Sequence, residues 1–160
     1  MHNVINVGIS DLNVTNPPGV LATYALGSCV GICLLDKTHN IGGLAHIMLP
    51  SSKEASNAAD NLRRYADTGI SELISTMQRK GAQLTCMTAK IAGGAQMFQT
   101  KLKSFNIGQR NVDAVKKVLA SYRIRIIAED TGLDYGRTVF FNVETGVMQV
   151  KSVNKGIVNL

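Results

Sequence analysis

Residues 23–50, TYALGSCVGICLLDKTHNIGGLAHIMLP, contain two apolar runs on either side of a short polar segment. Residues 30–35 (VGICLL) and 41–49 (IGGLAHIML) have the apolar, partly β-branched composition of strands, and Pro50 closes the second run. Residues 36–40 (DKTHN) between them are typical of a turn. This stretch therefore predicts a β-hairpin.

The predicted hairpin brings a thiol close to an imidazole. Pairing about the turn centre near residue 38 places His46 opposite roughly residue 30, next to Cys29. Neighbouring strands lie about 4.8 Å apart, so the two side chains can reach one another.

Further elements follow on both sides of the hairpin. Helices are predicted where apolar residues recur at three- and four-residue steps, at residues 58–80 (through Leu62, Ala66, Ile70, Leu73, Ile74 and Met77) and 112–122. Strands are predicted at residues 4–9, 20–26, 84–91 and 123–128, and a second hairpin at residues 138–143 and 147–153. The order predicts a single α+β domain over residues 1–160, with a mixed sheet or two packed sheets and about two to three flanking helices.

Composition narrows the classes of partner. Seventeen Lys and Arg against 11 Asp and Glu give a net charge of +6, but the cations are dispersed and aromatic residues make up only 5%. Nucleic-acid binding is not predicted, because base stacking needs aromatics among the cations. No apolar stretch approaches the ~20 residues of a membrane span. Three cysteines without a secretory leader predict a cytoplasmic protein with reduced thiols.

The three cysteines have different surroundings. Cys33, within ICLL, and Cys86, in a predicted strand, are expected to pack in the core as small apolar side chains. Cys29 follows Gly27 and Ser28, which permit a tight backbone bend of the kind that exposes a nucleophile. From its neighbours alone, Cys29 is either a core residue or a nucleophile.

A metal site at Cys29 is not predicted. Cys29 and Cys33 are four residues apart, which separates them by about 13 Å along a strand. Zinc ligands lie about 2.0–2.3 Å from the metal, and neither closely spaced cysteines nor a paired histidine motif is present. No cofactor is expected either.

His46 is the best candidate for a base. It lies in an apolar strand, where a histidine can also be a satisfied core residue, whereas His2 is terminal and His39 lies in the turn. An imidazole beside Cys29 would lower the thiol pKa and transfer its proton to a leaving group. A third polar group usually orients the imidazole, and Asp36 and Thr23 are the candidates.

Six motifs together resemble the CheD family of chemoreceptor glutamine deamidases. They occur in the family's order and cover about residues 20–150: LATYALGSCVGICLLD, GGLAHIMLP, RYAD, AKIAGGAQMF, NIGQRNVDAV and AEDTGLDYGRTVFFNVETGVMQV. One departure is that Gly132 is followed by Leu133, where family members commonly have paired glycines. This departure concerns the shape of a loop.

The resemblance implies a site and a fold. The family's cysteine falls on Cys29, its histidine on His46, and the threonine that completes its triad on Thr23. The implied fold is that of cysteine-dependent deamidating toxins, with mixed sheets flanked by helices.

The resemblance also implies partners. These are chemoreceptors as protein substrates and a CheC-type phosphatase that docks on the deamidase. Phe98, which follows Gly93 and Gly94, is the candidate for part of that docking surface, and an ordinary core aromatic is the alternative.

The implied reaction is deamidation of glutamine to glutamate through a thioester. The Cys29 thiolate would attack the amide, and backbone N–H groups around Gly27 and Ser28 would hold the oxyanion. His46 would protonate the departing ammonia and then activate water, while Thr23 orients its ring. Two alternatives stay open: a catalytically silent module that binds the phosphatase or receptors, and a cysteine protease or amidase with another substrate.

Overall fold

The hairpin predicted from residues 23–50 forms the centre of the computed structural model, which describes residues 3–97 and 106–160. Strands β4 (Val30–Asp36) and β5 (Ile41–Ile47) pair in antiparallel fashion, with Gly31 opposite His46. The predicted pairing is therefore confirmed to within one residue.

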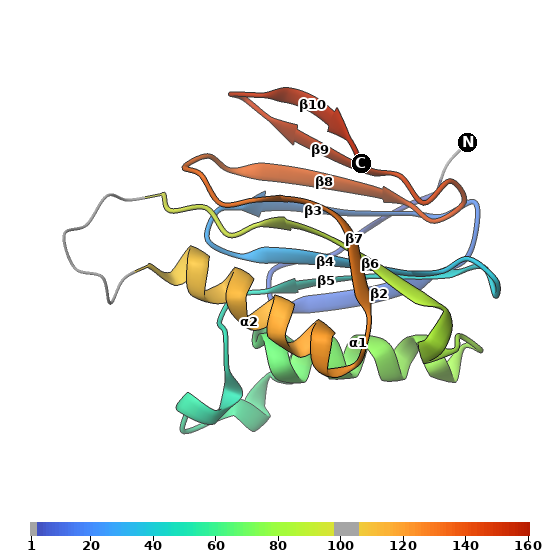
Figure 1. Cartoon of the computed structure of the whole chain (residues 1–160), viewed down its shortest axis with the longest axis horizontal. Coiled ribbons are helices and arrows are strands. Elements are labelled where there is room, and N and C mark those ends of the chain that lie inside the picture. Colours follow the sequence, from blue (N-terminus) through green and yellow to red (C-terminus); the bar gives the residue numbers. More distant parts are fainter. Residues whose placement is uncertain (1–2, 98–105) are drawn as a thin grey trace.

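Two five-stranded mixed sheets are built around this hairpin (Figure 1). The inner sheet has the order β2-β5-β4-β6-β7, and the outer sheet has the order β1-β3-β8-β9-β10. Each sheet contains one parallel pair, β6 with β7 and β1 with β3. The remaining strands are β1 (Val4–Asn6), β2 (Asp11–Thr15), β3 (Val20–Leu26), β6 (Met87–Gly93), β7 (Arg125–Thr131), β8 (Arg137–Asn142), β9 (Met148–Ser152) and β10 (Gly156–Asn159).

Three layers result from the packing of two helices and two sheets. Helices α1 (Ala66–Arg79) and α2 (Ile107–Ser121) lie on the same side of the inner sheet, and the outer sheet covers its other side (Figure 1). One apolar core fills the space between helices and inner sheet, and a second fills the space between the two sheets. The inner sheet is thus buried on both faces, which explains why β4 and β5 are apolar at almost every position.

The predicted α+β class is confirmed, and the structure selects two packed sheets over one mixed sheet. Among the described residues, no helix is long and apolar enough to cross a membrane.

The predicted helix at residues 58–80 begins too early. Residues 58–60 and 62–64 form separate 3-10 turns, and Leu62 is exposed. Tyr65 is extended because it bridges to Leu49 beside β5, and Ala66 then donates to the Leu49 carbonyl oxygen at 2.9 Å. This tertiary contact delays the start of α1, whereas α2 begins five residues earlier than the predicted residue 112.

Strand boundaries also differ from the prediction. The strand expected at residues 4–9 ends at Asn6, and β2 follows a turn in which Ser10 has a φ of 58°. β2 and β10 were not predicted, and they are only five and four residues long. Residues 84–86, expected to begin a strand, form a 3-10 turn before β6.

Candidate active site

Thr23 and His46 join the two sheets at one end of the central hairpin. Thr23 lies on β3 of the outer sheet, His46 lies on β5 of the inner sheet, and both side chains are fully buried. Thr23 Oγ1 lies 2.6 Å from His46 Nδ1. Two of the three predicted site residues are therefore in direct contact.

The Thr23 hydroxyl fixes the tautomer of His46. Thr23 Oγ1 donates to the Val7 carbonyl oxygen at 2.7 Å, and a hydroxyl has only one proton to give. Thr23 must therefore accept from His46 Nδ1–H, which leaves the lone pair of the neutral ring on Nε2. Among the described residues, His46 Nε2 has no hydrogen-bond partner, so it is available as a base.

Cys29 reaches the same buried layer from the neighbouring strand. It immediately precedes β4 and belongs to the apolar cluster between the two sheets. Because Gly31 pairs with His46, Cys29, two residues earlier on the same face, is the diagonal neighbour of the imidazole. A Cβ at Gly31 would lie 3.7 Å from the Thr23 methyl group. The same Cβ would lie 3.3 Å from Leu26 Cδ1, so a side chain at this position would crowd the layer between the sheets.

The bend at residues 27–29 is anchored through all three of its carbonyl groups. A bulge precedes it, where the β3–β8 register shifts and Ala25 has a φ of 60°. The three anchoring bonds are Ala95 N–H to the Gly27 carbonyl at 2.8 Å, Asn111 Nδ2 to the Ser28 carbonyl at 2.9 Å and Gly94 N–H to the Cys29 carbonyl at 2.8 Å.

The N–H groups of the bend face away from these anchors, since the N–H and C=O of a trans peptide point in opposite directions. No hydrogen bond between described residues uses the N–H of Ser28 or of Cys29. The Gly27 N–H, in contrast, already donates to the Ala25 carbonyl oxygen at 3.1 Å. Of the predicted oxyanion donors, those on Ser28 and Cys29 thus have no backbone acceptor among the described residues.

Two buried glycines contact the backbone of Cys29. Gly93 and Gly94 have φ values of 113° and 68°, and a Cβ at Gly93 would lie only 2.2 Å from the Cys29 carbonyl oxygen. A side chain at Gly93 would thus displace the bend. The role of these glycines in a docking surface stays a prediction, and Phe98 lies outside the described residues.

A buried arginine braces this glycine loop. Arg137 Nη2 lies 3.1 Å from Asp130, and its Nη1 donates to the Gly132 carbonyl oxygen at 3.0 Å. The Gly132 N–H in turn donates to the Gly93 carbonyl oxygen at 2.9 Å. Leu133, the departure from the paired glycines, keeps a left-handed φ of 61°, a conformation that costs a non-glycine residue about 1–2 kcal/mol.

Burial controls ionisation at the site. It raises the pKa of the Cys29 thiol, and the Cys29 backbone N–H offsets this only partly. Burial also lowers the pKa of His46 to about 4. The resting site therefore holds a neutral thiol and a neutral imidazole. The sequence had predicted a lowered thiol pKa, and the direction is reversed because removal from water dominates.

The remaining cysteines differ from one another. Cys33 is buried between the sheets, as predicted. Cys86 was predicted to be a core strand residue, but it is only half-buried and lies in a 3-10 turn. The turn ends there because β6 begins at Met87, which pairs with Asp36.

A second cluster of polar side chains lies at the opposite end of the hairpin, where Asp36, His39 and Cys86 place ligand atoms within 4.8 Å of one another. The Asp36 carboxylate accepts from His39 Nδ1 at 2.7 Å, from the His39 N–H at 3.0 Å and from the Gln83 N–H at 2.8 Å. These bonds occupy the carboxylate and leave one thiol and one ring nitrogen, fewer than tetrahedral zinc requires.

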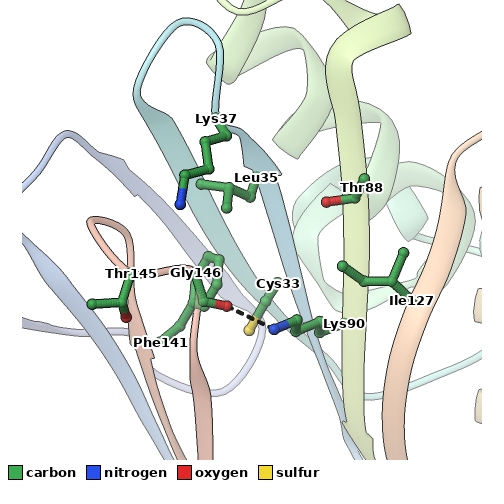
Figure 2. Close-up of a pocket in the computed structure, with 9 residues that line it drawn as sticks. All are labelled: Cys33, Leu35, Lys37, Thr88, Lys90, Ile127, Phe141, Thr145 and Gly146. Atoms are coloured by element: carbon green, nitrogen blue, oxygen red, sulfur yellow. Dashed lines mark hydrogen bonds between the residues drawn. The ribbon is translucent and has the colours of Figure 1, made fainter. Parts of the chain in front are cut away.

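A pocket of about 320 Å³ is lined by residues of both sheets, and Cys29 is not among its lining residues (Figure 2). Cys33, Leu35 and Phe141 are among its lining residues. Lys90 Nζ donates to the carbonyl oxygens of Gly146 and Leu160, each at 2.8 Å. This amine thus ties β6 to the β8–β9 turn and to the end of the outer sheet.

Comparison with known proteins identifies the family. Residues 48–152 match the family model described as CheD chemotactic sensory transduction. A protein of Syntrophomonas wolfei named "Probable chemoreceptor glutamine deamidase CheD" is 48% identical over 158 residues, which cover 98% of each chain. The chain belongs to the CheD family.

Two further CheD relatives carry the name "Chemoreceptor glutamine deamidase CheD". The Halalkalibacterium halodurans protein is 45% identical over 98% of each chain. The Thermotoga maritima protein is 43% identical over 150 residues, which cover 94% of this chain and 92% of the relative.

Two solved structures share the fold of this CheD chain. A Neisseria meningitidis protein of the DUF152 family is 12% identical, with a TM-score of 0.53, and the match covers 82% of this chain and 64% of that one. The Bacillus licheniformis hypothetical protein YfiH is 17% identical, with a TM-score of 0.50, and the match covers 78% of this chain and 51% of that one. At these identities the likeness concerns the fold alone.

The catalytic roles predicted for residues of this CheD chain stay predictions, and the structure shows where their side chains lie. The structure brings Thr23, His46 and Cys29 to one end of the hairpin and leaves Asp36 at the other. It adds Asn111, which the sequence analysis did not single out. The available signal was a polar residue at helical spacing among the buried Gly108, Val112, Val115 and Leu119.

Proposed function

We propose that this chain hydrolyses side-chain amides of glutamine residues in chemoreceptors, with Cys29 as nucleophile and His46 as general base. The observation that carries the proposal is the Thr23–His46 hydrogen bond of 2.6 Å, which leaves Nε2 unprotonated beside Cys29. The names of relatives 43–48% identical to this chain supply the substrate class.

The first step forms a carbon–sulfur bond. His46 Nε2 takes the Cys29 thiol proton as sulfur attacks the amide carbon, because the resting thiol is neutral. The imidazolium that forms keeps its Nδ1–H on the Thr23 hydroxyl. Thr23 therefore orients the ring in both protonation states.

The oxyanion of the tetrahedral intermediate is placed near the bend. The N–H groups of Ser28 and Cys29 are the donors proposed for it. The carbonyl groups of the same two peptides accept hydrogen bonds from Ala95 and Asn111, which hold both peptides in place. Such donors accelerate the reaction when they are already oriented before charge develops.

The second half of the reaction releases both products. The His46 imidazolium gives its proton to the leaving nitrogen, so ammonia departs and a Cys29 thioester remains. His46 then takes a proton from water as the water attacks the thioester carbonyl. The carbon–sulfur bond breaks, the thiol recovers its proton, and glutamate is left on the receptor.

Two further parts of the proposal concern partner and location. A CheC-type phosphatase is proposed to dock beside the loop of Gly93 and Gly94, and a partner seated there would lie next to the Cys29 bend. The reaction is placed in the cytoplasm, where cysteines such as Cys29 stay reduced.

Mass spectrometry of receptor fragments tests the proposal. Purified cytoplasmic receptor fragments are incubated with the wild-type chain, His46→Ala and His39→Ala. Wild type and His39→Ala should convert specific glutamines to glutamates, and His46→Ala should not. If wild type leaves every glutamine unchanged while a CheC-type phosphatase responds to it, the chain is a binding module. Cleavage of the receptor backbone would instead indicate a protease.

A further inference from the structure

Asn111 connects the two segments that carry Cys29 and His46. It lies on α2, and its side chain is fully buried. Its Nδ2 donates to the Ser28 carbonyl oxygen at 2.9 Å and to the Met48 carbonyl oxygen at 3.0 Å. Ser28 directly precedes Cys29, and Met48 follows His46 by two residues, so one amide group spans both segments.

The chemistry of the two partners requires an amide at this position. Both partners are carbonyl oxygens, which only accept, so the NH₂ group of Asn111 must face them. An aspartate of the same shape would place oxygen against oxygen. Among the described residues, Asn111 Oδ1 has no partner, so the side chain is retained with an unsatisfied buried acceptor.

The backbone of α2 is fixed close to the bend. A Cβ at Gly108 would lie 2.3 Å from the Ala95 carbonyl oxygen, so the helix touches the segment that follows β6. Ala95 itself donates to the Gly27 carbonyl oxygen at 2.8 Å. Asn111 therefore reaches the bend from a helix that is packed against the same loop.

The Ser28 carbonyl and the Cys29 N–H belong to one planar peptide and point in opposite directions. The bond from Asn111 to this carbonyl therefore determines where the Cys29 N–H points. Burial raises the pKa of the Cys29 thiol, and this N–H partly offsets that effect by lowering the pKa.

The structure assigns Asn111 as a positioning residue that orients the Ser28–Cys29 peptide, so that its N–H faces the oxyanion and the sulfur. The assignment rests on the proposed function and deepens it. Since a small misplacement of a catalytic group can cost about 100-fold in rate, loss of the amide should lower kcat by about that factor. KM should change little, because the Asn111 side chain is fully buried and bonds to backbone carbonyls.

The test uses Asn111→Asp and Asn111→Ala, with Gln109→Glu and Gln109→Ala as matched controls. Gln109 lies on the exposed side of the same helix, and its Nε2 donates to Asp113 at 2.8 Å. Its variants therefore show the effect of losing a side-chain amide from α2 at a position away from the site. All variants are made in a Cys86→Ser background. The readouts are kcat and KM for receptor deamidation, the pH dependence of Cys29 alkylation by iodoacetamide, and thermal unfolding.

The Asn111 variants should lose kcat, and their alkylation profile should shift to higher pH while they stay folded. The deficit of Asn111→Asp should shrink as pH falls, because a protonated carboxyl can donate to one of the two carbonyls. The Gln109 variants should match wild type.

Wild-type kcat and an unshifted alkylation profile in Asn111→Ala would overturn the assignment. Failure of both Asn111 variants to fold under conditions where the Gln109 variants fold would also overturn it, since the role would then be structural. If wild type shows no deamidation, the proposed function fails, but the alkylation profile still decides the role of Asn111.

Discussion

The two ends of the central hairpin carry the same kinds of side chain in different settings. At one end, His46 is fully buried, is the diagonal neighbour of Cys29 across the hairpin, and has its Nδ1 on the Thr23 hydroxyl. At the other end, His39 lies near Cys86 and has its Nδ1 on the Asp36 carboxylate.

The polar group bonded to the histidine Nδ1 distinguishes the two ends of the hairpin. Thr23 commits its proton to the Val7 carbonyl and leaves Nε2 of His46 as a free base in a buried layer. Asp36 instead collects the N–H groups of His39 and Gln83 and so holds a turn together. A cysteine and a histidine in proximity are therefore insufficient to identify a catalytic pair.

The largest expected contrast is between the cysteines. Cys29→Ala should lower deamidation by about 10⁴-fold or more, the scale on which loss of a nucleophile acts. Cys86→Ala should leave the rate unchanged. Rates are measured by mass spectrometry of a receptor fragment, with circular dichroism as the check that both variants fold. Equal losses in the two variants would abolish the contrast.

The histidines should differ almost as much. His46→Gln removes the base without a large change in volume and should lower kcat by about 10³-fold, within the range for general acid–base catalysis. His39→Gln should retain wild-type kcat. Steady-state kinetics on the same fragment measures both, and a wild-type kcat in folded His46→Gln would eliminate His46 as the base.

Thr23→Val tests the hydroxyl alone, because valine keeps the shape. A buried N–H without an acceptor costs about 1–3 kcal/mol, so kcat should fall by about 10–100-fold. Thr23→Ser, which restores the hydroxyl, should recover most of that loss. If serine and valine behave alike in kinetic assays, the threonine acts through packing.

Asp36→Asn should affect stability and leave catalysis intact. Replacement of one carboxylate oxygen by NH₂ opposes the N–H donors of the turn, so the free energy of unfolding should fall by about 1–2 kcal/mol. Urea denaturation measures this change, and deamidation by the folded variant should match wild type. A large loss of kcat at unchanged stability would instead connect Asp36 to the chemistry.

The two ends of the hairpin should affect the free energy of unfolding in different pH ranges. His46 has a folded pKa of about 4, below its usual 6.5, so the unfolded chain binds more protons between these values. Stability should therefore fall by up to about 1.4 kcal/mol per unit as pH drops from about 6.5 to 4. His46→Gln should remove this slope in urea titrations at several pH values, and an unchanged slope would contradict a neutral buried imidazole.

Asp36 should affect the free energy of unfolding at lower pH than His46 does. Burial alone would raise its pKa, but the N–H groups of Gln83 and His39 outweigh burial and lower it. Its contribution is therefore present above the unfolded pKa of about 3.9 and lost as pH falls through the folded value. Asp36→Asn should weaken the acid dependence in this lower window only, and part should remain because the pKa of Asp67 is also lowered.

Local patterns predicted the register of the central hairpin better than the boundaries of the other elements. The turn at residues 36–40 predicted the hairpin register that puts His46 close to Cys29. The residues alone left Asp36 and Thr23 as candidates to orient the imidazole, and the resemblance selected Thr23. The start of α1 could not be predicted, since the Tyr65–Leu49 bridge depends on tertiary structure. The neutral state of Cys29 was missed for a similar reason, because the burial that raises its pKa requires both sheets.

The most direct test of the catalytic assignment is to identify the cysteine that carries the acyl group. A receptor peptide containing a substrate glutamine is mixed with the enzyme, quenched in acid during turnover, digested and sequenced by mass spectrometry. The account predicts a glutamyl thioester on the peptide containing Cys29, and none on the peptide containing Cys86. A thioester on Cys86, or turnover with no adduct on Cys29 and undiminished activity in Cys29→Ala, would contradict it.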